Sequence, residues 1–445
     1  MIIENNANAK TIGLLKKGIW LYFALLVMEG ALRKWVLPGL STPLLVIRDP
    51  IAIWIMFTAW NNGLLPRNNY VSVMMGVGVI GLITTILFGH GNVPVGIYGA
   101  RPYLIHFPLI FVIGAILSRE DVEKVGKVML YVTIGMIVVI GLQFNSPQSA
   151  WINRGIGGDV EGSGFSGALG FYRPSGTFSF SNGITLFFSM ASSFILYFWL
   201  RPKGVNKIVL IGATLALMAS IPLSISRGLF FSIGVTVIFA LMAAALNPKL
   251  LGKIIFGGVA FSIAVLLLSF TSTFQNAVGA LANRFDTASV SEGGVEGTLV
   301  DRYLGGLLRA FSFNESLPMF GHGFGILSNV GTMLLSGKVV AGVSEGEWGR
   351  GIYEVGALLG IIIIVLRVGL SVSMFGRSLR KLREGDILPW LLLCFFLLNV
   401  PQGNWGQPTG LGFCVVIGGL LMASLKKPRP VVPDNQLINN KSVKF

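Results

Sequence analysis

Charged residues are scarce in this chain of 445 residues. Asp, Glu, Lys and Arg together make up 12% of it, whereas soluble globular domains carry about 25%. Apolar residues supply 53% of the sequence, which is more than a water-soluble protein needs for its core. The composition therefore excludes a soluble enzyme and predicts a protein that crosses a membrane many times.

Cysteine and histidine are scarcer still. The two cysteines, Cys394 and Cys414, both lie inside apolar runs, which excludes a disulfide framework or a zinc site built from them. The three histidines are spread over different loops. Walker, HExxH and GxSxG motifs are absent, and the glycines at 321–325 follow no predicted strand, so we expect a compact turn there and no nucleotide site. The sequence predicts no metal centre and no cofactor.

Long apolar runs, by contrast, are abundant. About 20 apolar residues cross a bilayer as a helix, and hydropathy windows of about 19 residues find twelve segments. All should be α-helices, because lipid offers no partner to exposed backbone groups and the even alternation of barrel strands is absent. The predicted fold is an all-α polytopic membrane protein with about 12 transmembrane helices. The segments are 18–32, 43–60, 71–88, 103–118, 125–143, 183–200, 207–223, 228–246, 253–270, 351–374, 387–399 and 409–424.

Lysine and arginine indicate how the chain is oriented. Placing the N-terminus in the cytoplasm makes every inside loop basic, as the positive-inside rule requires, and an even number of spans returns the C-terminus to that side. The net charge of +15 thus has a topological explanation, and no nucleic-acid partner is predicted. The predicted parts are spans 1–9 with a glycine-rich periplasmic loop at 144–182 (residues 1–270), a large periplasmic loop (271–350), spans 10–12 (351–425) and a cytoplasmic tail (426–445).

The external face uses one type of cation. Its predicted loops hold ten arginines but only two lysines, Lys34 and Lys338. Topology needs only positive charge, whereas a planar guanidinium is favoured where phosphate or carboxylate oxygens are bound in pairs. We expect this face to bind an anion; pairing with external Asp and Glu is the alternative for several of the arginines. The ten are Arg33, Arg48, Arg101, Arg154, Arg173, Arg227, Arg284, Arg302, Arg309 and Arg350.

Three of the predicted external segments carry arginines that are candidates for binding an anion. The glycine-rich loop ends in RPSGTF at 173–178, and the large loop contains the helix-compatible stretch DRYLGGLLR at 301–309. That stretch places Arg302 and Arg309 on one helix face. Arg227 lies in a turn between two spans that is too short to leave the membrane boundary, and a snorkelling arginine is the alternative there.

Acidic residues gather just before the tenth predicted span. Glu345 and Glu347 precede Arg350, and the first turns of the span hold Tyr353 and Glu354. A carboxylate at this place is either a structural counter-charge for an arginine or a catalytic base that accepts a proton. The residues alone leave both roles open.

Four runs, in this order, resemble the bacterial O-antigen polymerase and ligase superfamily. They are RPSGTF at 173–178, SRG at 226–228, the stretch from Arg302 to PMFGHGFG at 318–325, and EVGALLG at 354–360. The resemblance implies a multi-pass glycosyltransferase of the inner membrane whose active site faces the periplasm. It also implies undecaprenyl-diphosphate-linked oligosaccharides as substrates, and it places the two functional arginines of the family on Arg227 and Arg302.

One departure separates the branches of this family. The ligase branch has a His-Asn pair shortly before the Glu-x-Gly motif, where this chain has EGEW at 345–348. The missing histidine favours a polymerase, which joins lipid-linked repeat units into O-antigen or exopolysaccharide, over a ligase that transfers glycan to a lipid acceptor. A glutamate remains available to accept the proton of the attacking hydroxyl.

The expected mechanism follows from the bond that breaks. Arg227 and Arg302 stabilise the leaving lipid diphosphate in place of a metal ion, and Glu347 or Glu345 acts as general base on the acceptor hydroxyl. Trp348 is placed to stack on a sugar, although an interfacial aromatic belt explains most of the tryptophans equally well. The expected substrate-binding residues are Arg173, Arg309, Arg350, Tyr303, Trp348 and Glu354.

The strongest alternative from another class is a transporter or flippase for lipid-linked glycans. Such proteins place ionisable residues at mid-membrane and contain repeated halves. The predicted span centres are almost free of charge and no internal repeat is visible, so an enzyme is favoured. The expected partners are membrane lipid and the lipid-linked substrate, together with a chain-length regulator and a separate flippase.

Overall fold

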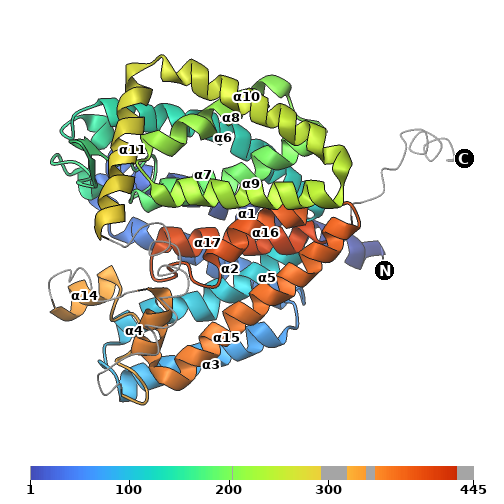
Figure 1. The fold of residues 1–445 in the computed structure, drawn as a ribbon. Helices are drawn as coiled ribbons and strands as arrows, with labels where there is room; N and C mark the ends of the chain where they lie inside the picture. The colour runs from blue at the N-terminus through green and yellow to red at the C-terminus, as the bar shows by residue number, and fades with distance from the viewer. Residues whose placement is uncertain (1, 203, 292–317, 337–345, 428–445) are drawn as a thin grey trace, which may run out of the picture.

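Helices form most of the described part of the protein (Figure 1). A computed structural model describes residues 2–202, 204–291, 318–336 and 346–427. Within these ranges the only strands are β1 (Ser166–Ala168) and β2 (Phe171–Tyr172), which pair in antiparallel fashion. The prediction of an all-α membrane protein is confirmed at the level of secondary structure.

Nine of the described helical segments are long and apolar enough to cross a membrane, judged by length and composition. The helices that build them are α1 (Ile2–Ala31), α2 (Arg48–Asn61), α3 (Asn69–Leu87), α4 (Val93–Arg101) with α5 (Phe107–Ile116), α6 (Arg119–Asn145), α7 (Asn182–Leu200), α9 (Arg227–Leu246), α10 (Leu251–Ser269) and α15 (Glu347–Arg383). Three apolar helices are shorter: α8 (Lys207–Leu223), α16 (Leu388–Asn399) and α17 (Pro408–Ser424). The twelve predicted segments fall on these helices, and how many of them cross the membrane stays a prediction.

Short helical turns and two further helices complete the described chain. Helices α11 (Ser272–Ser291) and α14 (Asn329–Ser336) lie in the stretch predicted as the large external loop, whose described ends are therefore partly helical. The turns are η1 (Leu32–Val36), η2 (Pro38–Leu40), η3 (Pro43–Val46), η4 (Pro102–His106), η5 (Trp151–Asn153), η6 (Ile156–Gly158) and η7 (Pro248–Leu250).

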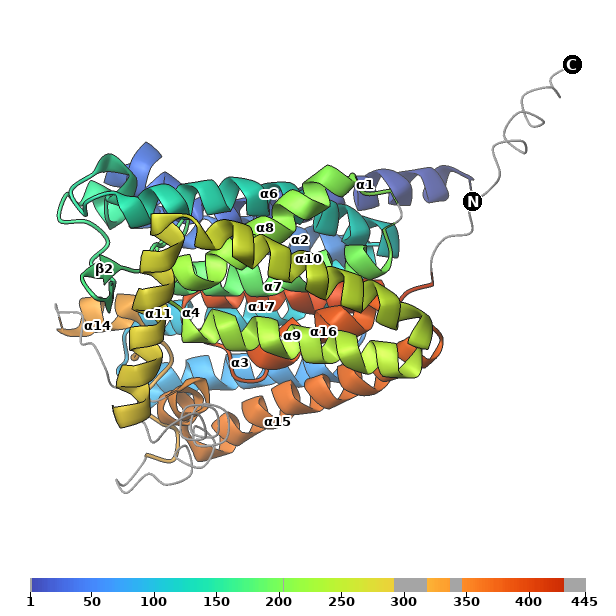
Figure 2. The ribbon, with the colours of Figure 1, turned by 45° about the horizontal axis from the view of Figure 1, so that its top comes forward.

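The middle of the bundle is built from its shorter helices. Helix α17 packs against α5, α7 and α16 (Figure 2), and nearly all of its side chains are buried. Helix α16 has 12 residues and is buried from Leu388 to Phe396. Neighbouring helices surround it, so its unpaired terminal backbone groups meet protein in place of lipid. Helix α10 lies on the outside, with 12% of its apolar stretch buried.

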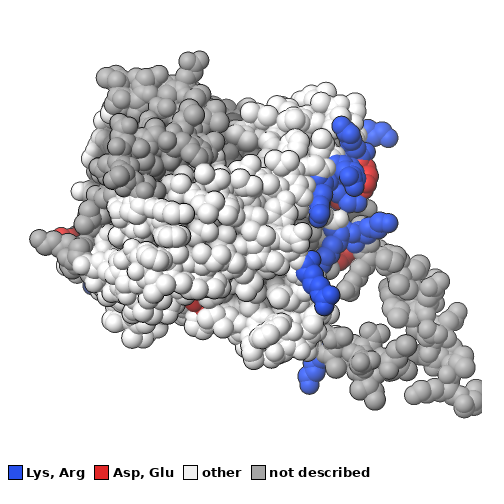
Figure 3. Space-filling model, turned by 90° about the horizontal axis from the view of Figure 1, so that it is seen from below, with Lys and Arg blue, Asp and Glu red and all other residues white. Residues whose placement is uncertain are grey.

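The two ends of the bundle differ in charge. The start of α1 and the end of α17 lie at one end, and the β1–β2 hairpin, α11 and α14 lie at the other (Figure 1). Exposed lysines and arginines gather at the first end (Figure 3). We call the first the basic end and the second the loop end. The positive-inside rule predicts that the basic end faces the cytoplasm.

This orientation gives a prediction about chemical labelling. A cysteine in place of the exposed Glu161, at the loop end, should react with a membrane-impermeant maleimide in intact spheroplasts. A cysteine in place of the exposed Lys124, at the basic end, should react only after the membrane is permeabilised. The native Cys394 and Cys414 are buried and should give little background. The reverse labelling pattern would show that the orientation is inverted.

Helix α15 is folded back on itself near its start. Gly356 has φ 79° and ψ 169°, which breaks the helix. Glu347 and Arg367 are 20 residues apart yet form a hydrogen bond of 3.0 Å, whereas 20 residues of straight helix span about 30 Å. The segment before Gly356 therefore turns back along the segment after it. The span predicted at 351–374 is interrupted at this glycine, and its first residues belong to the folded-back segment.

The break at Gly356 requires glycine for two reasons. The positive φ is unfavourable for residues with a side chain, and an added Cβ would lie 2.1 Å from the carbonyl oxygen of Met319. We expect Gly356→Ala to destabilise the protein by about 1–3 kcal/mol. Unfolding by SDS titration in mild detergent would measure the loss. Gly376→Ala is the matched control, because Gly376 lies in the helical part of α15 and an added Cβ would meet open space. This variant should be as stable as the parent protein or more stable. Equal losses of stability in both variants would contradict the role of the break at Gly356.

Candidate functional site

Arg227 is held by a strained and capped turn at the loop end. Helix α8 ends at Leu223 and α9 begins at Arg227. Between them, Ile225 has φ 45°, a conformation that is a genuine outlier for a β-branched residue and costs about 1–3 kcal/mol. Ile225 is fully buried, and Ser226 caps α9 by accepting from the backbone N–H of Leu229 at 3.2 Å. The strain is thus offset locally, and Arg227 is fixed on the first turn of α9.

The β1–β2 hairpin brings two more arginines to the same place. Ile225 packs against Gly167 of β1, where an added Cβ would lie 2.8 Å from its Cδ1. Arg173 directly follows β2, and its backbone N–H donates to the carbonyl of Phe165 at 2.9 Å. Arg284 of α11 donates to the carbonyl of Ser166 at 3.4 Å. The hairpin therefore gathers Arg173, Arg227 and Arg284, which we call the hairpin arginines.

Packing of α11 on α9 supports this arrangement. Phe285, next to Arg284, contacts the rings of Phe230 and Phe231 edge-on, with centroids 5.7 and 5.9 Å apart. Those two phenylalanines lie one turn after Arg227. The N-terminus of α9 contributes a partial positive charge beside the guanidinium, because its first backbone N–H groups have no partner within the helix. Guanidinium groups and a helix N-terminus together favour an anionic ligand.

The segment at 174–181 is buried although its polar composition predicts an external loop. Lys34 donates to the hydroxyl of Ser175 at 2.9 Å and to the carbonyl of Gly176 at 2.7 Å. The side chain of Gln143 accepts from the backbone N–H of Gly176 at 2.7 Å. Thr177 donates to the carbonyl of Val27 at 2.6 Å. These bonds satisfy irregular backbone inside the bundle, and they anchor the residues that follow Arg173.

Three of the predicted external arginines serve as internal counter-charges. Glu29 contacts Arg33 at 3.4 Å and Arg48 at 3.3 Å, and Arg101 contacts Asp49 at 2.6 Å. All of these groups lie mainly within the protein. Each of these arginines therefore has a carboxylate partner, Glu29 or Asp49, although two carboxylates face three guanidinium groups.

A second buried charge cluster surrounds Glu347. Its Oε1 accepts from Arg350 at 2.7 Å and from Arg367 at 3.0 Å. Its Oε2 accepts from Arg350 at 3.0 Å and from the backbone N–H of Trp405 at 3.1 Å. Arg350 also donates to Glu354 at 2.7 Å, and the Glu347 side chain is 1% exposed. These are the contacts expected of a structural counter-charge; the general-base role of Glu347 stays a prediction.

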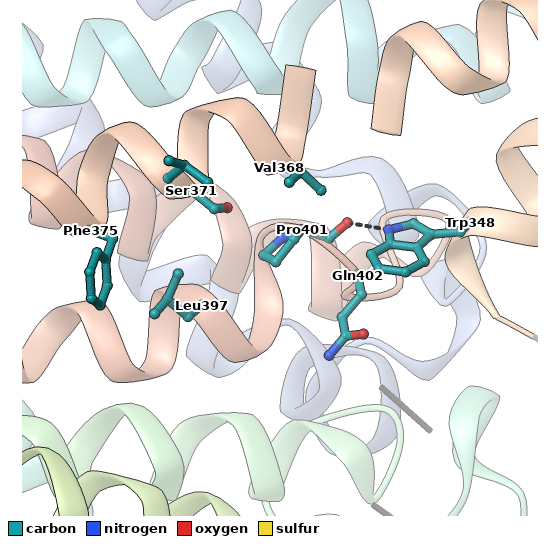
Figure 4. A pocket seen from close by; sticks show the side chains of 8 residues that line it. Trp348, Val368, Ser371, Phe375, Leu397, Pro401 and Gln402 are labelled. Atoms are coloured by element: carbon teal, nitrogen blue, oxygen red, sulfur yellow. Dashed lines mark hydrogen bonds between the residues drawn. The ribbon is translucent and has the colours of Figure 1, made fainter. Parts of the chain in front are cut away.

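An apolar groove of about 400 Å³ lies beside this cluster, between α15 and α16 (Figure 4). The indole N–H of Trp348 donates to the carbonyl of Pro401 at 2.7 Å. Trp348 thus forms one end of the groove, and its hydrogen bond holds it in place. The other lining residues are Val368, Ser371, Val372, Phe375, Leu397, Pro401 and Gln402.

No family model, curated protein or solved structure matches this chain. In the part of the chain that the structure describes, no group of three His, Cys, Asp or Glu side chains is arranged to hold a metal ion.

The structure places the predicted site residues in two groups. Arg173 and Arg227 lie around the hairpin. The second group lies in the folded-back start of α15 and consists of Glu347, Trp348, Arg350 and Glu354. Arg302, Tyr303, Arg309 and Glu345 lie outside the described residues.

Sequence reasoning gave no role to three residues that the structure brings into these groups. Arg284 counts as an external arginine in the sequence, but nothing along the chain links it to Arg173 or Arg227. Arg367 lies inside an apolar run, and Trp405 contributes only its backbone N–H and its ring, over which Arg367 lies at 4.2 Å. Only the unusual position of Arg367, a cation within a span, could have indicated a partner.

Proposed function

We propose that this protein is a polysaccharide polymerase of the bacterial inner membrane. It would transfer a glycan from undecaprenyl diphosphate to the terminal sugar of another lipid-linked repeat unit, at the periplasmic face. The observation that carries this proposal is Arg227, which a strained and capped turn holds at the loop end beside two other arginines. A strained residue lowers the stability of the folded protein, and such residues cluster at functional sites, where the strain is retained.

The hairpin arginines suit the leaving group of this reaction. A hydroxyl oxygen of the acceptor sugar attacks the anomeric carbon of the donor, and the bond between that carbon and the diphosphate oxygen breaks. The electron pair leaves with the lipid diphosphate, which gains negative charge. Arg227, with Arg302 and helped by Arg173 or Arg309, would stabilise that charge, because guanidinium groups bind diphosphate oxygens in pairs and preorganised donors favour the charge that develops in the transition state. Arg284 is a further candidate for this set.

The proton of the attacking hydroxyl needs an acceptor. Glu347 and Glu345 are the candidates, and Glu347 is already bonded to four donors. It would have to release an arginine before it could take a proton, which is costly for a buried pair. We therefore favour Glu345 as the base and Glu347 as the residue that fixes Arg350.

A polymerisation assay tests the proposal. Purified full-length protein in detergent is incubated with lipid-linked repeat units extracted from cells that lack the protein. We expect a ladder of oligomers on a gel, together with release of undecaprenyl diphosphate. Transfer to a lipid acceptor with no ladder would identify a ligase. If neither a ladder nor released lipid diphosphate is found, the protein is not a glycosyltransferase of this kind.

One observation favours a second function, a flippase for lipid-linked glycans. Arg367 is 1% exposed within a helix long and apolar enough to cross a membrane, and ionisable residues inside spans often mark transport paths. Its bond to Glu347 gives it a structural partner, so we rank this function second. Vesicles with purified protein that move a fluorescent lipid-linked sugar between leaflets, without joining sugars, would favour it.

A further inference from the structure

A cleft of about 350 Å³ opens at the basic end, between α3, α5, α15 and α17. Its inner wall is apolar and lies within the bundle: Phe111, Leu370 and Met374 are each less than a tenth exposed. Tyr70 and Ser373 line it with hydroxyl-bearing side chains. The volume is at the lower end of the range for small-molecule sites, about 300–1,000 Å³.

Two cations line this cleft, and no carboxylate does. Arg377 is exposed, and among the described residues no hydrogen bond or ion pair engages it. Lys426 donates to the carbonyl of Ala115 at 2.6 Å and to that of Leu117 at 2.7 Å, at the C-terminus of α5. An ammonium has three donors, so one remains for a ligand.

The carboxylate of Asp121 acts on Lys426 electrostatically, but it is already paired with Lys16. Burial and the positive charge of Lys16 lower the pKa of Lys426. Other acidic groups at the basic end are paired as well, among them Asp386 with Arg119 and Glu384 with Lys381. A bound anion would offset the positive charge at the mouth of the cleft.

The chemistry of the ligand follows from this combination of apolar walls and cationic rim. Inorganic phosphate would meet the cations and leave the apolar walls without a partner. A zwitterionic lipid would fill the walls, but its own cation would weaken the interaction with Arg377. Basic pockets between transmembrane helices at a cytoplasmic face are suited to anionic headgroups.

We propose that this cleft binds one anionic phospholipid from the leaflet at the basic end, with an acyl chain against Phe111, Leu370 and Met374 and its phosphate between Arg377 and Lys426. The site lies at the opposite end from the hairpin arginines, and the proposal does not depend on the polymerase function. The lipid would tie α3, α5, α15 and α17 together at the membrane surface.

Native mass spectrometry of the purified full-length protein tests this. Titration with phosphatidylglycerol should show one lipid retained preferentially, whereas phosphatidylcholine should bind at least about fivefold more weakly. Arg377→Gln should weaken phosphatidylglycerol binding about fivefold, the factor that corresponds to about 1 kcal/mol for one cation at the surface. Ser373→Leu should weaken binding of both lipids, because it fills the cleft without changing its charge.

Arg383→Gln is the matched control. Arg383 is also an exposed arginine of α15 at the basic end, but it does not line the cleft, so its loss should leave the affinity unchanged. Equal affinities for the two lipids, or equal losses in Arg377→Gln and Arg383→Gln, would overturn the proposal in favour of diffuse surface attraction. Unchanged binding in both Arg377→Gln and Ser373→Leu would also overturn it. Specific binding of inorganic phosphate, lost in Arg377→Gln, without preferential retention of phosphatidylglycerol would show that the cleft binds a free anion instead.

Discussion

Replacing Arg227 by lysine should lower the rate of glycan polymerisation by about a hundred- to thousandfold, although the positive charge is kept. A lysine ammonium is a single point donor and cannot bind two diphosphate oxygens at once, as a guanidinium does. The loss of one such contact in the transition state costs about 2.7–4 kcal/mol. Arg227 directly follows a strained and capped turn, and no rotamer of a lysine there would supply the fork of two N–H donors that a guanidinium has. Initial rates of ladder formation, at matched protein levels in the membrane, would measure the effect.

Two variants accompany this experiment. Arg302→Lys should show a loss of the same size, since the family resemblance assigns that residue the same role. Arg383→Lys, an exposed arginine at the basic end, should be fully active. Normal polymer from both Arg227→Lys and Arg302→Lys would reduce these arginines to anchoring at the membrane boundary, and the transition-state argument would then be wrong.

Replacing Glu347 by glutamine should destabilise the protein by about 3–5 kcal/mol, the cost of removing one partner from a buried ion pair. Arg350 would still be paired with Glu354 at 2.7 Å, but Arg367 would lose its 3.0 Å contact with a carboxylate. Arg367 is almost fully buried and would carry an uncompensated charge. SDS titration in mild detergent and the amount of protein in the membrane would both report the loss.

The double variant Glu347→Gln with Arg367→Gln should recover much of that stability, because it leaves the Arg350–Glu354 pair and no unbalanced charge. Glu384→Gln is the control: Glu384 forms a surface pair with Lys381, and its loss should leave stability almost unchanged. A Glu347→Gln protein of normal stability and abundance that binds substrate but makes no polymer would instead establish Glu347 as the general base.

The positions of the apolar helices and of the main arginine could be predicted from the sequence. The twelve apolar segments lie on helical parts of the structure. Backbone groups in lipid have to form hydrogen bonds within their own helix, and the hydropathy of a segment is an average over residues that are neighbours in the chain. The turn between α8 and α9 is only three residues long, so Arg227 had to lie at its boundary. These features depend on residues close together in the chain.

The charge partners could not be predicted in the same way. Arg48 and Asp49 are adjacent in the sequence, yet Arg48 contacts Glu29 and Asp49 contacts Arg101. An ion pair depends on which helix packs beside which, and that is set by contacts summed over the whole bundle. The sequence therefore showed an excess of arginines in the predicted external loops but did not show which of them have a carboxylate partner.

The sequence by itself thus determined that the chain is mostly helical and has helices apolar enough to cross a membrane, since hydropathy depends on the composition of each local segment. The tertiary structure alone decided that α15 folds back at Gly356, where the backbone of Met319 comes so close that only glycine fits. The same fold brings Glu347 to Arg367 and collects Arg173, Arg227 and Arg284 around one hairpin. Residues from distant parts of the chain meet only when the helices are packed, and no local pattern encodes that meeting.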